Sequence, residues 1–205
     1  MAGKPIQEQF GQVIIDAVSQ FAAVDLQSPS TLEAGSFSHV GDAKLRRRLC
    51  EVFYGARWIY KLGLALLVKD QQQSAHVRAQ ITDYAAVCEG ALLDMFEHAL
   101  VRQLLTGQRY TFQDAARLRN KITWVIGSHR KELSFKSLAW FILVADEERI
   151  ITPRTAAELQ WLRVERNHVH VRAYSRASYV DKSKKAFEAV HLLLNDTKRW
   201  RQANP

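Results

Sequence analysis

Apolar residues recur at intervals of three and four along most of this chain, which is the spacing of helices that bury one face. Residues 42–69 and 74–105 each carry such a stripe and predict two long helices. Residues 25–41 are rich in Ser, Gly and Pro and predict a loop. A helix over residues 5–24 is predicted to bury six apolar positions: Phe10, Val13, Ile14, Val18, Phe21 and Ala22.

Further helices are predicted towards the C-terminus. Two shorter ones cover residues 111–126 and 134–147, and the last covers residues 181–200. Between them Thr152 is a suitable N-cap and Pro153 suits a first helical turn, so another helix begins there. Since no internal repeat interrupts this series, the sequence predicts an all-α, up-and-down bundle of six to seven helices.

Composition agrees with one helical domain over residues 1–205. Hydrophobic residues make up 47% and charged residues 24%, as in ordinary globular proteins, and only 4 Pro and 9 Gly occur.

Cys50 and Cys88 lie in apolar helical stretches, which favours small buried hydrophobes over a disulfide or a metal site. The N-terminus does not resemble a signal peptide, and the longest apolar runs, at 62–68 and 138–145, are too short to cross a bilayer. We therefore expect a cytoplasmic protein with no metal, no cofactor and no membrane partner.

The net charge of +8 is concentrated in the last part of the chain. Residues 161–205 hold ten Lys and Arg against four Asp and Glu. Such an excess attracts polyanions, but it also serves solubility, and charge alone favours neither interpretation. The basic region opens with WLRVERNHVHVR at residues 161–172, where three arginines, an asparagine and two histidines interrupt an amphipathic pattern.

Four residues of this segment share one face of the predicted helix. At about 100° per residue, Arg166, Asn167 and His170 fall with Arg163 within roughly a third of the circumference, whereas His168 lies off that face. The helix places no acidic residue among the four, although a solvated face normally mixes charges of both signs. This composition is suited to binding an anion.

Cleavage of RNA through its own 2′-hydroxyl needs no residue types beyond these. Arginine forks stabilise negative charge at phosphorus, a histidine exchanges protons with the 2′-hydroxyl or the 5′-oxygen, and asparagine orients the group it binds. The competing interpretation is a surface or a dimer contact, which Arg- and His-rich helix ends form more often than catalytic sites.

LRVERNHVH resembles the motif of HEPN domains, which are all-helical proteins with an Arg, four to six residues and then a His. Four residues separate Arg163 from His168 and six separate it from His170, so both histidines fit, and the shared face favours His170. The closing helices and ITDYAAVCEGALLDMF, with its Glu in an apolar row, extend the resemblance over about residues 74–202. Residues 1–70 resemble no family and are interpreted as an N-terminal helical extension.

The resemblance implies a metal-independent endoribonuclease that acts as a homodimer, in which two motif helices form one composite site. Arg163 and Arg166 would bind the scissile phosphate, Asn167 would orient it, and His170 would act as acid or base. The products would carry a 2′,3′-cyclic phosphate and a 5′-hydroxyl. Many such proteins belong to toxin–antitoxin or antiviral systems, which implies an antitoxin or defence-complex partner. Others have lost catalysis and bind RNA or a protein.

Two further features bear on this hypothesis. Arg172, Tyr174 and Arg176 interleave basic and aromatic groups and are predicted to bind RNA, the alternative being a loop packed on the bundle. Glu89 stands in an apolar helix, where it is either functional near the motif or a buried carboxylate satisfied by an arginine. The sequence contains no Gly-rich phosphate loop, Ser-His-Asp arrangement, CxxC pair or HExxH.

Overall fold

The fold is an all-α bundle, confirming the predicted class. The computed structural model describes residues 11–105, 109–112, 122–125, 133, 137–167 and 180–205. Within these residues it has seven helices and one short pair of strands. The helices are α2 (Gln12–Ala23), α3 (Pro29–Ala34), α4 (Ala43–Ala65), α5 (Asp70–Val101), α7 (Leu138–Glu147), α8 (Pro153–Asn167) and α9 (Val180–Ala203).

Helices α3, α4, α7 and α8 begin at side chains that accept hydrogen bonds from free backbone N–H groups of the first turn. Asp42 accepts hydrogen bonds from the backbone N–H groups of residues 44 and 45, at 2.8 and 2.9 Å. Ser137 accepts from the N–H of Trp140 at the start of α7. The predicted N-cap of α8 is confirmed, because Thr152 Oγ1 accepts from the N–H of Thr155 at 3.2 Å.

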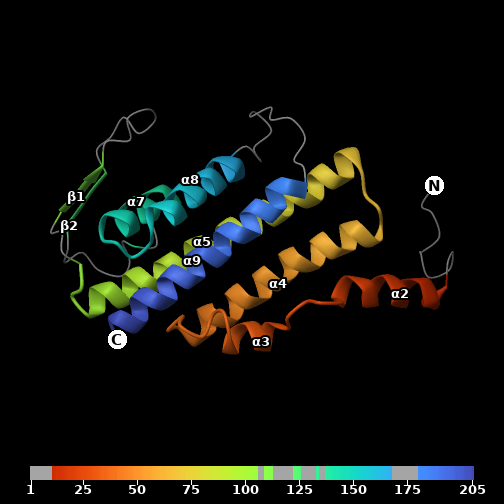
Figure 1. Cartoon of the computed structure of the whole chain (residues 1–205), viewed down its shortest axis with the longest axis horizontal. Coiled ribbons are helices and arrows are strands. Elements are labelled where there is room, and N and C mark those ends of the chain that lie inside the picture. The colour runs from red at the N-terminus through yellow and green to blue at the C-terminus, as the bar shows by residue number, and fades with distance from the viewer. Residues whose placement is uncertain (1–10, 106–108, 113–121, 126–132, 134–136, 168–179) are drawn as a thin grey trace.

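The helices stack in layers around α5 (Figure 1). Helices α4, α9, α8 and α7 all contact α5, and α8 also packs against α7 and α9. Helices α2 and α3 contact α4 on the opposite side of the bundle. Of the helices that the structure describes, none is long and apolar enough to span a membrane.

One hydrophobic core joins the N-terminal and C-terminal helices. Phe53 of α4 stacks on Phe187 of α9 with ring centroids 5.6 Å apart, and the Phe187 ring also makes a T-shaped contact with the buried Tyr84 of α5. Leu32 of α3 belongs to the same cluster of buried residues. Helix α4, although it comes from the segment without a resemblance, therefore packs into the same core as α5 and α9.

Both cysteines are buried, Cys50 on α4 and Cys88 on α5, and both are free thiols. Burial, together with the nearby Glu33 carboxylate, raises the pKa of Cys50 to about 11 despite the opposing effect of Arg46. Complete burial raises the pKa of Cys88 still further. The two side chains act as small core residues.

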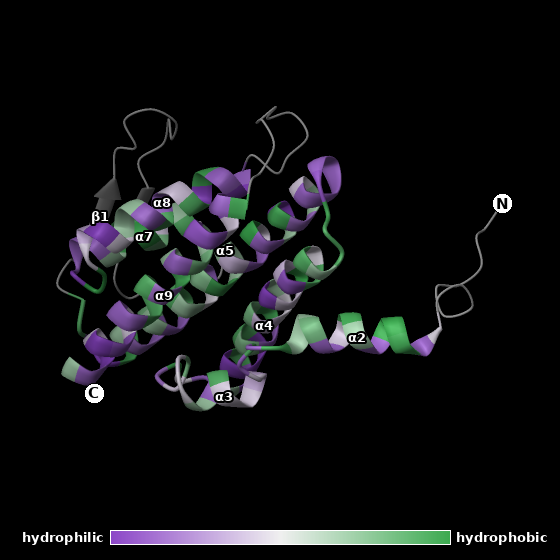
Figure 2. Ribbon diagram, turned by 45° about the vertical axis from the view of Figure 1, so that its right-hand side comes forward, coloured by the Kyte–Doolittle hydropathy of each residue, from purple (hydrophilic) through white to green (hydrophobic). Residues whose placement is uncertain are grey.

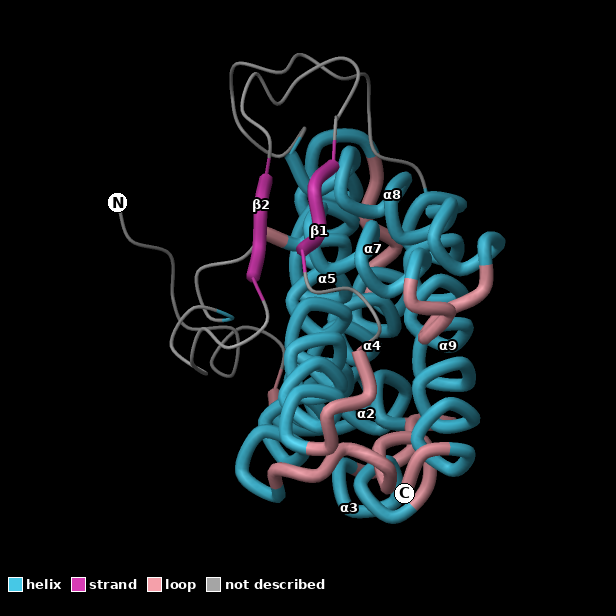
Figure 3. The backbone as a smooth tube through the Cα atoms, turned by 90° about the vertical axis from the view of Figure 1, so that its left-hand side faces the viewer, coloured by secondary structure: helices cyan, strands magenta, loops and turns pink. Residues whose placement is uncertain are grey.

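The predicted helix over residues 111–126 is wrong in its described parts. Two strands, β1 (Arg109–Phe112) and β2 (Ile122–Val125), pair antiparallel, with residue 109 opposite residue 125. Figure 3 shows them beside the helices. Their sequences, RYTF and ITWV, are rich in aromatic and β-branched residues, which favour strands over helices. Residues 25–41 also differ from the predicted loop, since they include the six-residue helix α3.

The prediction for α2 is wrong in a different respect. The helix forms, but of the apolar positions expected to be buried only Ala22 is fully buried, and Val18 is partly buried. Val13 is 81% exposed, and Ile14 and Phe21 are each about half exposed. Phe10 lies outside the described residues. Helix α2 therefore carries apolar surface that the bundle described here does not cover.

Candidate functional site

Helix α8 presents Arg166 at the position where its buried stripe would continue. Thr155, Leu159 and Leu162 are buried at intervals of four and three, and Arg166 follows after four more residues. Its guanidinium reaches α5, where Nη1 donates to Glu89 Oε2 at 2.9 Å. The side chain of Arg166 is 38% exposed and that of Glu89 is 34% exposed. The pair therefore lies at the edge of the core, within reach of solvent.

This ion pair answers the question raised by Glu89. The carboxylate binds an arginine, but it is partly exposed, and the arginine belongs to the predicted site. We call the side of α8 that carries Arg163, Arg166 and Asn167 the arginine face. Its own helix places no acidic residue on it, as the sequence indicates, but Glu89 reaches it from α5. Helical spacing along one segment cannot reveal such a contact, because it depends on how two distant helices pack.

Arg163 and Asn167 lie on the same side of α8, three residues before Arg166 and one after it. Arg163 Nε donates to Gln160 Oε1 of the preceding turn at 2.8 Å. Among the described residues no carboxylate lies within ion-pair distance of Arg163. Asn167 is exposed and is the last described residue of α8. Arg163 therefore has a neutral amide as its partner and no acidic partner within the described part of the chain.

The remaining predicted site residues lie outside the described part of the chain. These are His170, the alternative His168, and the predicted RNA-binding residues Arg172, Tyr174 and Arg176. The structure thus places the arginines and the asparagine on one helix end, while the choice between the two histidines and the RNA-binding assignments stay predictions.

Ion pairs to α9 fix the opposite side of α8. Lys182 Nζ lies 2.8 Å from Glu165 Oε2, and Lys185 Nζ lies 3.2 Å from Glu158 Oε2. The Lys185 ammonium also lies 4.5 Å from the centre of the Trp161 ring. Because these contacts hold the other face, the arginine face is turned away from α9.

The first turn of α8 is tied to α9 by Asp196, which sequence reasoning missed. This carboxylate is 6% exposed, and its Oδ2 accepts from the N–H and Oγ1 of Thr152 and from Thr155 Oγ1, at 2.9, 3.0 and 2.6 Å. Arg199 Nη2 donates to the other oxygen at 2.7 Å. Burial opposes the charged form, but these hydrogen bonds and the arginine outweigh it and lower the pKa of Asp196. The available signal was the position of Asp196 three residues after Leu193, where the apolar stripe of α9 continues.

A second buried network lies near the same end of α9, on residues that follow Asp196. Asp94 of α5 is 4% exposed and accepts from the N–H groups of Gly41 and Asp42 and, at 2.5 Å, from Arg201 Nη1 of α9. His39 Nε2 lies 2.8 Å from Thr197 Oγ1. Burial and the Arg201 charge lower the pKa of His39 to about 4, so this ring is neutral at pH 7. We interpret the network as structural, because it ties the segment before α4 to α5 and α9.

The described part of the site has a composition suited to binding an anion, and its net charge is modest. Two guanidinium groups and one carboxylate leave one positive charge on the helix end, beside an exposed amide. Arginine donors placed in this way bind phosphate oxygens in a fork geometry. Among the described residues there is no cluster of His, Cys, Asp and Glu that would hold a metal ion.

No protein-family model, no curated protein and no solved structure matches this chain.

Proposed function

We propose that the chain is a HEPN-type endoribonuclease that cleaves RNA without a metal ion. The observation that carries the proposal is the Glu89–Arg166 pair. It holds one motif arginine at the edge of the core, next to Arg163 and Asn167 on the same helix end. An arginine fixed in this way is oriented before the phosphate arrives, which lowers the cost of ordering it in the transition state.

The proposed reaction transfers the phosphoryl group within the RNA itself. The 2′-oxygen forms a bond to phosphorus while the bond to the 5′-oxygen breaks. The 2′-hydroxyl gives up its proton to a base and the leaving 5′-oxygen receives one from an acid, and His170 fills one of these roles. Arg163 and Arg166 stabilise the charge on the phosphate oxygens, and Asn167 orients them. The products are a 2′,3′-cyclic phosphate and a 5′-hydroxyl.

In this proposal Glu89 is a positioning residue, and a second copy of the chain completes the site. Glu89 touches Arg166 and not the RNA, so its contribution acts through the arginine. A homodimer would bring two motif helices together, with Arg172, Tyr174 and Arg176 extending the RNA contact. An activity that destroys cellular RNA needs control, which is why the proposal includes an antitoxin or a defence complex as partner.

A non-catalytic module that binds RNA or a protein through the same face is the second candidate. It is favoured by the same ion pair, because Glu89 neutralises part of the charge that Arg166 would otherwise offer to a scissile phosphate. The two candidates differ in whether covalent bonds break.

The test is an incubation of the purified protein with total RNA in the presence of EDTA. We expect cleavage that EDTA leaves unchanged, and fragments that end in a 2′,3′-cyclic phosphate. His170→Ala should abolish it and Arg163→Ala should reduce it strongly, while Arg47→Ala, an exposed arginine on α4, should cleave like the wild type. RNA binding without cleavage by the wild type would support the second candidate, and full activity of His170→Ala would refute the catalytic assignment.

A further inference from the structure

Helix α2 has an apolar surface about three times as wide as the part that the bundle covers. At about 100° per residue, the partly or fully buried Ile15, Val18 and Ala22 occupy roughly 60° of the circumference. A second apolar stripe lies beside it. It is made of Val13, Ile14, Ala17 and Phe21, all exposed. Figure 2 shows hydrophobic colouring along α2, which projects at one end of the molecule. A helix with this pattern is built to be covered on both stripes.

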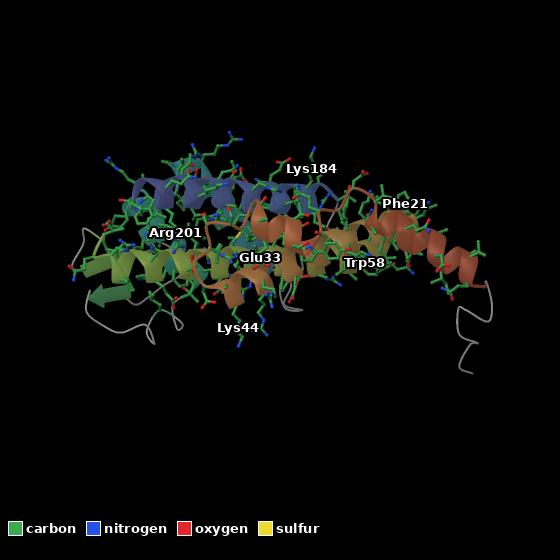
Figure 4. All side chains as sticks on the ribbon, turned by 90° about the horizontal axis from the view of Figure 1, so that it is seen from below. Phe21, Glu33, Lys44, Trp58, Lys184 and Arg201 are labelled. Atoms are coloured by element: carbon green, nitrogen blue, oxygen red, sulfur yellow. The ribbon has the colours of Figure 1, made fainter. Side chains whose placement is uncertain are left out.

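The exposed apolar side chains gather at one end of the described structure. Seven of its eight large exposed hydrophobic residues belong to α2 and the residue that follows it, or to the end of α4 and the turn after it: Val13, Ile14, Phe21, Val24, Leu64, Leu66 and Leu67. We call this set the α2 face. Lys61 of α4 joins the two parts, because its Nζ lies 5.2 Å from the Phe21 ring centre. Figure 4 shows Phe21 at the end of the molecule opposite Arg201. An apolar patch of this kind marks an interaction site.

An apolar groove of about 250 Å³ opens next to the α2 face. Leu64 and Leu67 form one wall, and Val77 of α5 and Val180 of α9 contribute from the neighbouring helices. Gly63 keeps the groove open, because any larger residue would place a Cβ only 3.0 Å from His76 Nδ1. That nitrogen is buried and has no hydrogen-bond partner within the described structure. The same end of the molecule thus offers an apolar helix and a groove of matching character.

Charge argues against a lipid surface as the occupant. A helix that binds anionic membranes carries Lys and Arg along its polar side. Within residues 12–23 the only charged residue is Asp16, and it is exposed. Lys69, at the edge of the groove, is exposed as well and carries the opposite sign. A surface with both a projecting apolar helix and a groove, with opposite charges beside them, complements a second copy of itself, as a two-fold interface requires.

We propose that the α2 face is the interface with a second copy of this chain, in which the exposed stripe of α2 from each copy packs into the groove of the other. Each contact occurs twice, once in each direction. Val180 lines the groove and is the first residue of α9, directly after the segment that carries the predicted His170. The partner copy thus lies against the start of α9, which comes after the motif in the sequence. The interface stands without the proposed function, since assembly is measured without RNA.

The test measures the mass of the purified full-length chain in solution over a wide concentration range. We expect a dimer of twice the 23.5 kDa chain mass. Leu67→Glu and Val13→Glu should each raise the dimer Kd by about a hundredfold, because each places a carboxylate in an apolar contact. Val101→Glu is the matched control. Val101 is 71% exposed but lies at the other end of α5 from the groove, so the dimer Kd of Val101→Glu should equal that of the wild type. Circular dichroism should show the same helix content in the wild type and the three variants.

A mixture of the two weakened variants tests the pairing of α2 with the groove. A mixed dimer keeps one intact contact, between the unaltered α2 of Leu67→Glu and the unaltered groove of Val13→Glu. The mixture should therefore dimerise more strongly than either variant alone. A monomeric wild type, a dimer that persists in Leu67→Glu, or a mixture no better than its components would each overturn the inference. A dimer that persists in Leu67→Glu would still be compatible with contact through the motif helices, so the proposed ribonuclease would stand.

Discussion

Replacing Asp196 should loosen the start of α8 and destabilise the whole bundle. The carboxylate is almost fully buried, accepts three hydrogen bonds from Thr152 and Thr155, and pairs with Arg199. Asp196→Ala removes the acceptor and leaves the Thr152 N–H and the Thr155 hydroxyl without it. Asp196→Asn keeps the shape and one acceptor oxygen but loses the charge.

The expected size of the effect follows from the donors. A hydrogen bond to a charged group contributes about 1.5–3 kcal/mol, but the buried carboxylate also costs desolvation energy, so the three do not simply add. We expect Asp196→Ala to lower the free energy of unfolding by ~3–4 kcal/mol and Asp196→Asn by ~2 kcal/mol. Glu188→Gln, at an exposed position on the same helix, should change it by less than ~0.5 kcal/mol.

Urea denaturation followed by circular dichroism measures these differences, and pH provides a second readout. Because the folded pKa of Asp196 lies below the unfolded value, its contribution is complete above the unfolded pKa and is lost as the pH falls through the folded pKa. The difference between the wild type and Asp196→Asn should therefore be full at neutral pH and shrink below about pH 4. A loss under ~1 kcal/mol for Asp196→Ala at pH 7 would refute the view that this carboxylate anchors α8.

Three further outcomes are expected. Glu89→Gln should lower the free energy of unfolding by less than ~1 kcal/mol, because the Glu89–Arg166 pair is partly exposed. The same change should lower kcat for RNA cleavage about tenfold without raising KM. A raised KM at constant kcat would contradict a positioning role. Arg201→Met should cost ~3 kcal/mol in urea denaturation, because it leaves the buried Asp94 carboxylate without its cation. Leu159→Ala should cost ~2–5 kcal/mol in the same assay, since Leu159 is fully buried.

The helices were predictable from sequence where a local pattern decides them. The stripes of α4, α5 and α9 and the Thr152–Pro153 start of α8 specify helices without reference to the rest of the chain. The hairpin was missed because RYTF and ITWV are short, and a four-residue strand leaves too few positions to distinguish a period of two from one of 3.6.

The candidate site was predictable in part for the same reason. The shared face of Arg163, Arg166 and Asn167 follows from positions on one helix. The partner of Arg166 does not, because Glu89 stands 77 residues earlier and reaches it only through the packing of α5 on α8. Asp196 and Asp94 were missed on similar grounds, since each binds groups from distant segments.

The rates at which the two buried thiols are chemically labelled report on how the bundle opens. Cys50 and Cys88 lie in α4 and α5, which pack together in the core, and burial suppresses the thiolate form of both. A thiol reagent reacts with the thiolate, so labelling must await exposure of the side chain. If the two thiols react at one common rate, α4 and α5 open together, whereas faster labelling of Cys50 would show that α4 separates from the bundle first.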